Sequence, residues 1–175
     1  EERLASAMAL CTNAEVDSDG KSTGETDEAA LIVYARTLGL EKSALSAAEQ
    51  RVGEIPFDSG RKMMSTVHKA ENGYIQYTKG APDEILKHCS HALIDGKVVE
   101  ITASASEKIN EENTRMGNNA LRVFAAAYKT YPSEPAEYIG EKLENGMTFI
   151  GLVGMIDPPR NEAKEAIRLC KKAGI

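Results

Sequence analysis

Apolar residues recur along this chain with two periods, one typical of helices and the other of strands. Helical spacing first appears at Leu4, Met8 and Cys11, and a polar stretch over residues 12–21 then interrupts the pattern. Helices are predicted, in chain order, at residues 4–11, 26–39, 43–50, 83–91, 104–116, 136–143 and 161–173. The clearest start signal is Pro82, because proline is favoured at the first position of a helix.

Strands are predicted where β-branched and aromatic residues gather between turn residues. They are expected at residues 51–57, 63–69, 74–79, 121–128 and 148–156, with two short strands before and after Asp95-Gly96. Asn72-Gly73 and Asp95-Gly96 are dipeptides that favour tight hairpins, so the neighbouring strands should pair antiparallel. The pattern therefore predicts an α+β fold in which an antiparallel β-sheet is flanked by helices.

The final segment has a different pattern. The strand that ends near Ile156 leads into Asp157-Pro158-Pro159-Arg160 and then into a helix, and no further strand follows in this sequence. A strand, loop and helix in this order have apolar faces that suit a parallel sheet. We therefore expect residues 1–150 to form one domain and residues 151–175 to be the start of a segment of a neighbouring domain.

Composition narrows the classes of function. The chain has 175 residues, of which 42% are hydrophobic, enough for one buried core. Its net charge of −6 argues against nucleic-acid binding, which requires a basic face. The three cysteines are far apart in sequence, which fits a reducing compartment better than a disulfide framework. The longest apolar run, residues 149–156, is too short to span a bilayer, so we expect no direct membrane contact by this segment.

Two local patterns resemble other kinds of site and have simpler explanations. Gly20-Lys21-Ser22-Thr23 resembles the end of a phosphate-binding loop, but Glu15 stands where that loop needs glycine, so a surface turn is favoured. His88, Cys89 and His91 could face one metal ion near a helix end. A metal site usually needs three or four ligands, and histidines at a helix end more often interact with the helix dipole.

Two clusters carry residue types that can bind a nucleotide. Phe57, at the end of a predicted strand, is followed by a turn and then by Lys62. An aromatic ring can stack on a purine and a lysine can donate to phosphate oxygens, although a phenylalanine at a strand end more often packs in the core. In the second cluster, Lys79 precedes Gly80-Ala81-Pro82. Small residues before a helix start suit an anion, and they also occur in ordinary strand-to-helix turns.

These clusters belong to a longer series of motifs. In chain order they are Thr26-Asp27-Glu28-Ala29-Ala30-Leu31, Phe57-Asp58-Ser59-Gly60-Arg61-Lys62, Lys79-Gly80-Ala81-Pro82, Leu121-Arg122-Val123-Phe124 and Asp157-Pro158-Pro159-Arg160. The series resembles that of P-type ATPases, and in particular the nucleotide-binding (N) domain of type II pumps similar to the calcium-transporting ATPases. The tail over residues 151–175 resembles the segment with which such chains re-enter their phosphorylation domain.

The resemblance implies a role for five single residues. Phe57 would stack on adenine, and Glu28 would meet the amino edge of the base. Lys62 and Lys79 would line the pocket beside the nucleotide, and Arg122 would reach toward the phosphates. One aromatic ring, one acceptor and several cations are the groups that a negatively charged ATP needs.

Two further positions have implied roles, and two depart from the family pattern. Asp157 and Arg160 would lie on the phosphate side of the site or at the hinge between domains. Asp27 stands where such pumps often have threonine, and Asp83 where they usually have glutamate. The additional carboxylate of Asp27 would weaken ATP binding.

The function implied by the resemblance is to bind ATP and to present it to the phosphorylation domain of the same chain in a cation pump, with Ca²⁺ as the expected ion. Mg²⁺ would accompany ATP in the whole pump, and the γ-phosphate would pass to an aspartate of the phosphorylation domain. The sequence contains no Asp-Lys-Thr-Gly-Thr segment. We therefore expect this chain to bind ATP without hydrolysing it, as a cytoplasmic domain of an integral membrane protein.

Two other functions remain as alternatives. The final segment suggests a phosphatase of the haloacid-dehalogenase type, but that class needs a nucleophilic aspartate motif, which we do not identify in the sequence. The second alternative is an interaction or regulatory module that has kept the fold and lost nucleotide binding. Asp27 is the one feature that favours this second alternative.

Overall fold

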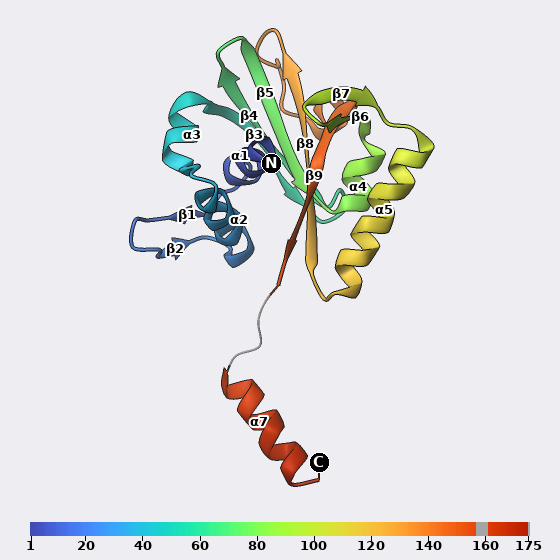
Figure 1. Ribbon diagram of the computed structural model, residues 1–175. Coiled ribbons are helices and arrows are strands. Elements are labelled where there is room, and N and C mark those ends of the chain that lie inside the picture. Colours follow the sequence, from blue (N-terminus) through green and yellow to red (C-terminus); the bar gives the residue numbers. More distant parts are fainter. Residues whose placement is uncertain (157–160, 175) are drawn as a thin grey trace.

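A seven-stranded sheet forms the centre of the computed structural model, which describes residues 1–156 and 161–174 (Figure 1). The strands of this sheet lie in the order β3-β4-β5-β8-β9-β6-β7. They span Gln50–Asp58 (β3), Met63–Ala70 (β4), Gly73–Gly80 (β5), Cys89–Ile94 (β6), Lys97–Glu100 (β7), Arg122–Tyr131 (β8) and Met147–Met155 (β9). A separate ribbon is formed by β1 (Glu15–Val16) and β2 (Ser22–Thr23).

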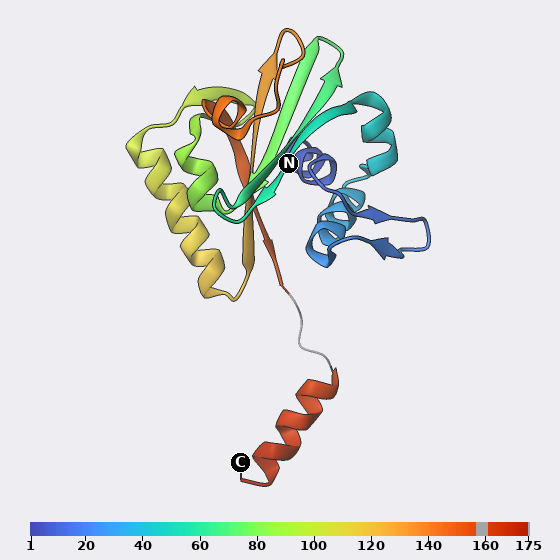
Figure 2. The ribbon, with the colours of Figure 1, turned by 180° about the vertical axis from the view of Figure 1, so that it is seen from behind.

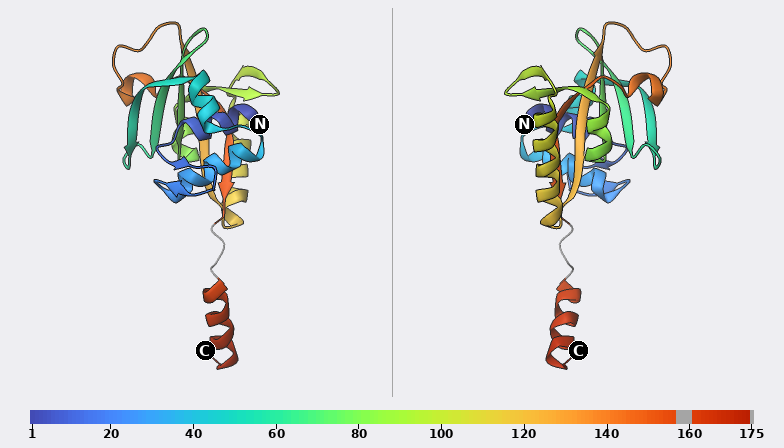
Figure 3. Two further views of the ribbon diagram at one scale, coloured as in Figure 1. Left: turned by 90° about the vertical axis from the view of Figure 1, so that its left-hand side faces the viewer. Right: turned by 90° about the vertical axis from the view of Figure 1, so that its right-hand side faces the viewer.

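Helices cover both faces of the sheet. The helices are α1 (Glu2–Leu10), α2 (Thr26–Thr37), α3 (Lys42–Ala48), α4 (Pro82–Lys87), α5 (Ala103–Asn118), α6 (Gly140–Leu143) and α7 (Asn161–Lys172). The views in Figures 2 and 3 show α1, α2 and α3 on one side of the sheet and α4 and α5 on the other, while α7 stands apart from both layers. No helix of the described residues is both long and apolar enough to cross a membrane.

Two hydrophobic cores fill the spaces between these layers. One core joins α1 and α2 to the sheet and includes Met64 and Tyr77, whereas the other includes Met63 and Ile85 of α4. Met63 and Met64 are neighbours in β4 and belong to different cores because successive strand residues point to opposite faces of a sheet. The structure thus confirms the predicted α+β fold with a mostly antiparallel sheet flanked by helices.

Two helix boundaries and one strand pairing differ from the predictions. The helix expected at residues 83–91 ends at Lys87, because the following backbone pairs with β9 and forms β6 instead. That pairing is parallel, so the sheet is not antiparallel throughout, as had been predicted. The helix expected at residues 136–143 begins only at Gly140.

The polar stretch expected to be a loop contains the first strand of the small ribbon. Glu15 of β1 pairs with Thr23 of β2. Between them the Asp17 carboxylate accepts hydrogen bonds from the backbone N–H groups of Asp19 and Lys21, at 3.0 and 2.8 Å. The Gly20-Lys21 dipeptide therefore lies in a turn, as the surface-turn interpretation predicted.

His68 is a buried titratable residue on β4, with only 1% of its surface exposed. Its Nδ1 lies 3.0 Å from the carbonyl oxygen of Glu49, and its Nε2 lies 2.8 Å from the hydroxyl of Thr66. Burial lowers the pKa of His68 to about 4; the Glu49 carbonyl opposes this shift and the positive charge of Arg51 adds to it. His68 is therefore neutral in the folded chain near pH 7.

We expect the free energy of unfolding to fall as pH is lowered from about 6.5 to 4. The unfolded chain binds a proton at His68 near pH 6.5, and the folded chain binds it only near pH 4, so protons favour unfolding across this window. The loss should reach roughly 2–3 kcal/mol. Chemical unfolding at several pH values measures this loss, and His68→Gln should remove it. An unchanged pH dependence in His68→Gln would contradict the prediction.

Candidate functional site

The five nucleotide-site residues predicted from the sequence gather around one end of the main sheet. Backbone pairing aligns one residue from each of four adjacent strands at this end: Asp58, Met63, Gly80 and Ala125. Phe57 and Lys62 flank this row at the connection between β3 and β4. Lys79 precedes Gly80, and Arg122 is the first residue of β8, three residues before Ala125. Glu28 reaches the same region from α2.

Glu28 and Lys79 form a shielded ion pair between α2 and β5. The Nζ of Lys79 lies 2.6 Å from Oε1 of Glu28, and their side chains are 6% and 15% exposed. The other oxygen, Oε2, accepts hydrogen bonds from the backbone N–H groups of Asn13 and Ala14, at 2.8 and 3.0 Å. Burial acts to raise the pKa of Glu28, but the hydrogen bonds and the charge of Lys79 lower it below its usual value. The carboxylate is therefore ionised near neutral pH.

Arg122 is paired with the residue next to Glu28. Its guanidinium forms an ion pair with the carboxylate of Asp27, and the two side chains are 68% and 39% exposed. The guanidinium carbon also lies 5.3 Å from the ring centre of Phe124, over its face. The first turn of α2 thus holds cations on two different strands, β5 through Glu28 and β8 through Asp27.

Phe57 is the most exposed aromatic side chain at this end of the sheet, with 63% of its surface accessible. The pairing of β3 with β4 is irregular between Ile55 and Asp58, so Phe57 lies in a bulge rather than in the regular ladder. The sequence left open whether this ring packs in the core. In the structure it lies on the surface, where its face can meet a planar ligand.

Lys62 closes the turn that follows Phe57. Its backbone has a positive φ of 54°, and its carbonyl oxygen accepts a hydrogen bond of 3.0 Å from the N–H of Ala81. A Cβ atom on Gly80 would come within 2.4 Å of that carbonyl oxygen, so glycine is required there for the two segments to approach. The Lys62 ammonium lies 3.4 Å from Glu84 and is half exposed.

Some parts of the site were not predicted from the sequence. The backbone N–H groups of Asn13 and Ala14 carry no side-chain signal, and they contact Glu28 only because the ribbon begins beside α2. The contact between Asp27 and Arg122 was also missed, although both residues belong to the motifs of the series. Asp157 and Arg160 lie outside the described residues.

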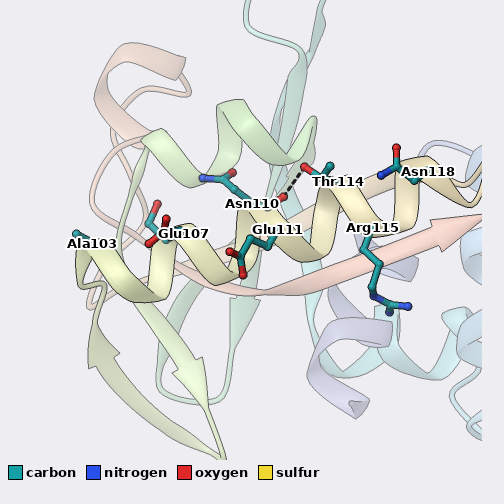
Figure 4. A pocket seen from close by; sticks show the side chains of 8 residues that line it. Ala103, Glu107, Asn110, Glu111, Thr114, Arg115 and Asn118 are labelled. Carbon is teal, nitrogen blue, oxygen red and sulfur yellow. Dashed lines mark hydrogen bonds between the residues drawn. The ribbon is translucent and has the colours of Figure 1, made fainter.

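Other candidate features lie elsewhere. A hollow of about 800 Å³ runs along α5 (Figure 4), and none of the five candidate residues lines it. His88 and His91 contact Asn145 and Ser90 at 3.0 and 2.8 Å. Among the described residues, no group of three or more His, Cys, Asp or Glu side chains is arranged to hold a metal ion.

Comparison with known proteins gives consistent matches along the chain. A family model described as "P-type ATPase, cytoplasmic domain N" matches residues 2–162. Calcium-transporting ATPase 1 of Bacillus cereus is 44% identical over 96% of this chain and 19% of its own length. A calcium-transporting ATPase of Listeria monocytogenes is 38% identical over 100% of this chain and 20% of its own. The sodium/potassium-transporting ATPase subunit alpha-A of Artemia franciscana is 31% identical over 98% of this chain.

The chain spans about one fifth of the length of these calcium-transporting relatives. These relatives are named for different cations, calcium in some and sodium with potassium in another. Similarity over this portion therefore does not distinguish one transported ion from another.

Replacing Glu28 by glutamine should destabilise the fold by about 2–4 kcal/mol, because Lys79 would remain buried without its counter-charge. Chemical unfolding at pH 7 measures the change. The matched control is Glu112→Gln, which removes an exposed ion pair with Arg115 on α5 and should leave the unfolding midpoint unchanged. Equal effects of the two substitutions would show that the pair of Glu28 and Lys79 is no more important than a surface contact.

Proposed function

Because this chain belongs to the family of cytoplasmic N domains of P-type ATPases, we propose that it binds ATP and presents it to a phosphorylation domain of the whole protein. The observation that carries the proposal is the exposed ring of Phe57, which lies at the same end of the sheet as Lys62, Lys79 and Arg122. An exposed aromatic ring close to several cations suits a ligand that has both a planar base and a chain of phosphates.

The adenine base would lie against Phe57. Its amino edge would face the carboxylate of Glu28, which Lys79 and two backbone N–H groups hold in place. In this arrangement the carboxylate is an acceptor whose orientation is fixed before the ligand arrives, so little ordering is needed on binding.

The phosphates would extend toward Lys62 and Arg122, whose side chains are at least half exposed and can reorient. Each already contacts a carboxylate, Glu84 or Asp27, so phosphate oxygens would have to share or replace that partner. Mg²⁺ would arrive with ATP and neutralise part of the phosphate charge. We assign no Mg²⁺ ligand to this chain, whose own residues bind and orient the nucleotide.

In the whole protein, residues 1–150 would form the ATP-binding domain. Residues 151–175, the first five of which complete β9 of the same sheet, would lead into the phosphorylation domain. Asp157 and Arg160 would lie on the phosphate side of the site or at the hinge. The whole protein would be a cation pump, with Ca²⁺ proposed because several relatives are named for calcium transport. The phosphoryl acceptor would belong to the phosphorylation domain, so this chain alone would bind ATP without hydrolysing it.

One observation favours a second candidate, an interaction or regulatory module without nucleotide binding. Asp27 and Glu84 already pair with Arg122 and Lys62, the two cations that the phosphates would use. A titration with ATP separates the two functions. Saturable amide shifts at Phe57, Lys62 and Arg122 support nucleotide binding, whereas no shift at millimolar ATP supports the module.

Phe57→Ala should weaken ATP binding by about 5- to 150-fold, because base stacking on an aromatic ring contributes roughly 1–3 kcal/mol. Calorimetric titration measures the dissociation constant, and Phe57→Trp should keep most of the affinity. Ile94→Ala is the matched control, since Ile94 is also exposed but lies on β6. If Phe57→Ala bound ATP as tightly as the parent chain, Phe57 would not be the adenine platform.

Asp27→Asn should strengthen ATP binding by about 2- to 5-fold, because it frees the guanidinium of Arg122 for phosphate. The gain should shrink as salt is raised, since the competing charges are exposed. Glu107→Gln on α5 changes the net charge by the same amount away from the site and serves as the control. Equal gains in both variants would mean that net charge alone, and not the contact with Arg122, controls affinity.

A further inference from the structure

The position of the Phe57 ring is set by the backbone that carries it and not by packing around the ring. With 63% of its surface exposed, it has few packing contacts, so its direction depends on the backbone that carries it. That backbone lies in the bulge of β3, where the regular ladder with β4 is interrupted between Ile55 and Asp58. The ladder holds this segment at Ile55 and Asp58, so contacts within the bulge between them decide where the ring points.

Local hydrogen bonds shape the tip of the turn. The Asp58 carboxylate accepts from the N–H groups of Gly60 and Arg61, at 3.0 and 2.9 Å, and the Asp58 carbonyl accepts from the N–H of Lys62 at 2.7 Å. These bonds join residues within the turn to one another. They do not attach the strand before the turn to the rest of the domain.

Arg61 attaches the bulge itself to a distant segment of the chain. Its Nη2 donates a hydrogen bond of 2.7 Å to the carbonyl oxygen of Pro56, which belongs to the peptide bond that leads into Phe57. Its Nη1 donates to Oε2 of Glu144, which is 83 residues away in sequence. One planar guanidinium thus joins the backbone beside Phe57 to the residue at the end of α6.

Glu144 is anchored in the interior. It is 2% exposed, and its Oε1 accepts a hydrogen bond of 2.7 Å from the hydroxyl of Ser65 on β4. Ser65 in turn lies 2.8 Å from the hydroxyl of Thr78 on β5. A buried carboxylate needs both a cation and hydrogen bonds, and Glu144 has both in this network.

The chain leaves room for this contact at Gly140. A Cβ atom there would come within 2.6 Å of Glu144 Oε2 and 3.2 Å of Arg61 Nη1. The absence of a side chain at Gly140 therefore lets the guanidinium and the carboxylate meet beneath the first residue of α6.

We propose that Arg61 and Glu144 are positioning residues, which hold the bulge of β3 so that Phe57 presents its ring to the adenine base. This inference rests on the proposed ATP binding. The two residues act on the base and not on the phosphates, because their hydrogen bonds reach the backbone before Phe57 and the interior of the sheet. If the two residues served stability alone, replacing them would destabilise the fold but would not weaken binding of the base more than binding of the phosphates.

The test compares binding of ATP with binding of inorganic tripolyphosphate, which has the phosphates and no base. The variants are Glu144→Gln, Arg61→Met and Arg61→Lys, each first examined by its amide spectrum for an intact fold. We expect each to weaken ATP binding by about 3- to 10-fold and to change tripolyphosphate binding by less than about 2-fold. Arg61→Lys should weaken ATP binding as Arg61→Met does, because an ammonium cannot bridge Pro56 and Glu144 in the fixed geometry of a guanidinium.

A double variant sharpens the test. Arg61→Met with Glu144→Gln should weaken ATP binding no more than either change alone, because both remove the same connection. Glu112→Gln, which removes the ion pair with Arg115 on α5, should leave both affinities unchanged. If Glu144→Gln does not fold, Arg61→Lys, which keeps a cation next to Glu144, still tests the bridge to Pro56.

The outcomes separate the two proposals. If Phe57→Ala loses ATP affinity while the Arg61 and Glu144 variants keep it, the positioning role is wrong and ATP binding stands. Equal weakening of ATP and tripolyphosphate binding would also overturn the positioning role. If the parent chain binds tripolyphosphate and ATP equally, or neither of them, the adenine site itself is wrong and the positioning role falls with it.

Discussion

A buried ammonium group needs a carboxylate within reach, and the contact of Lys79 with Glu28 meets this need at the point where α2 joins the sheet. The same carboxylate accepts from the backbone of Asn13 and Ala14, so the ribbon is attached through it as well. The neighbouring Asp27 then contacts Arg122 on β8. One helical turn therefore joins β5, β8 and the ribbon, and the geometry of the candidate site depends on it.

The charges of this end of the sheet are already balanced in the protein itself. Lys79, Arg122 and Lys62 each have an acidic partner, but the three contacts differ in their shielding from water. The contact of Lys79 is nearly enclosed and is best understood as part of the architecture. The contacts of Arg122 and Lys62 face solvent, where Coulomb attraction is weak and partners exchange readily. The candidate site thus combines one enclosed ion pair with exposed cations whose partners can exchange.

The sequence was informative where local chemistry determines the structure. The proline at position 82 and the Asn72-Gly73 turn correctly indicated the start of α4 and the hairpin of β4 and β5. It was uninformative where distant segments compete. Residues 89–91 continue a helical pattern, but they form β6 because β9 offers parallel backbone partners almost 60 residues later in the chain. The contact of Arg61 with Glu144 was missed for the same reason, since nothing in the sequence around either residue indicates that the two meet.

The path of β9 has a mechanical consequence. At its far end Met155 pairs with Arg122, the first residue of β8, and the ladder then continues back through the domain. A pull on the chain at Met155, directed along the strand, would load these hydrogen bonds in shear, so that many resist together and none opens alone. Tension at that end would thus move β8 and β9 as one unit and would carry the guanidinium of Arg122 with them.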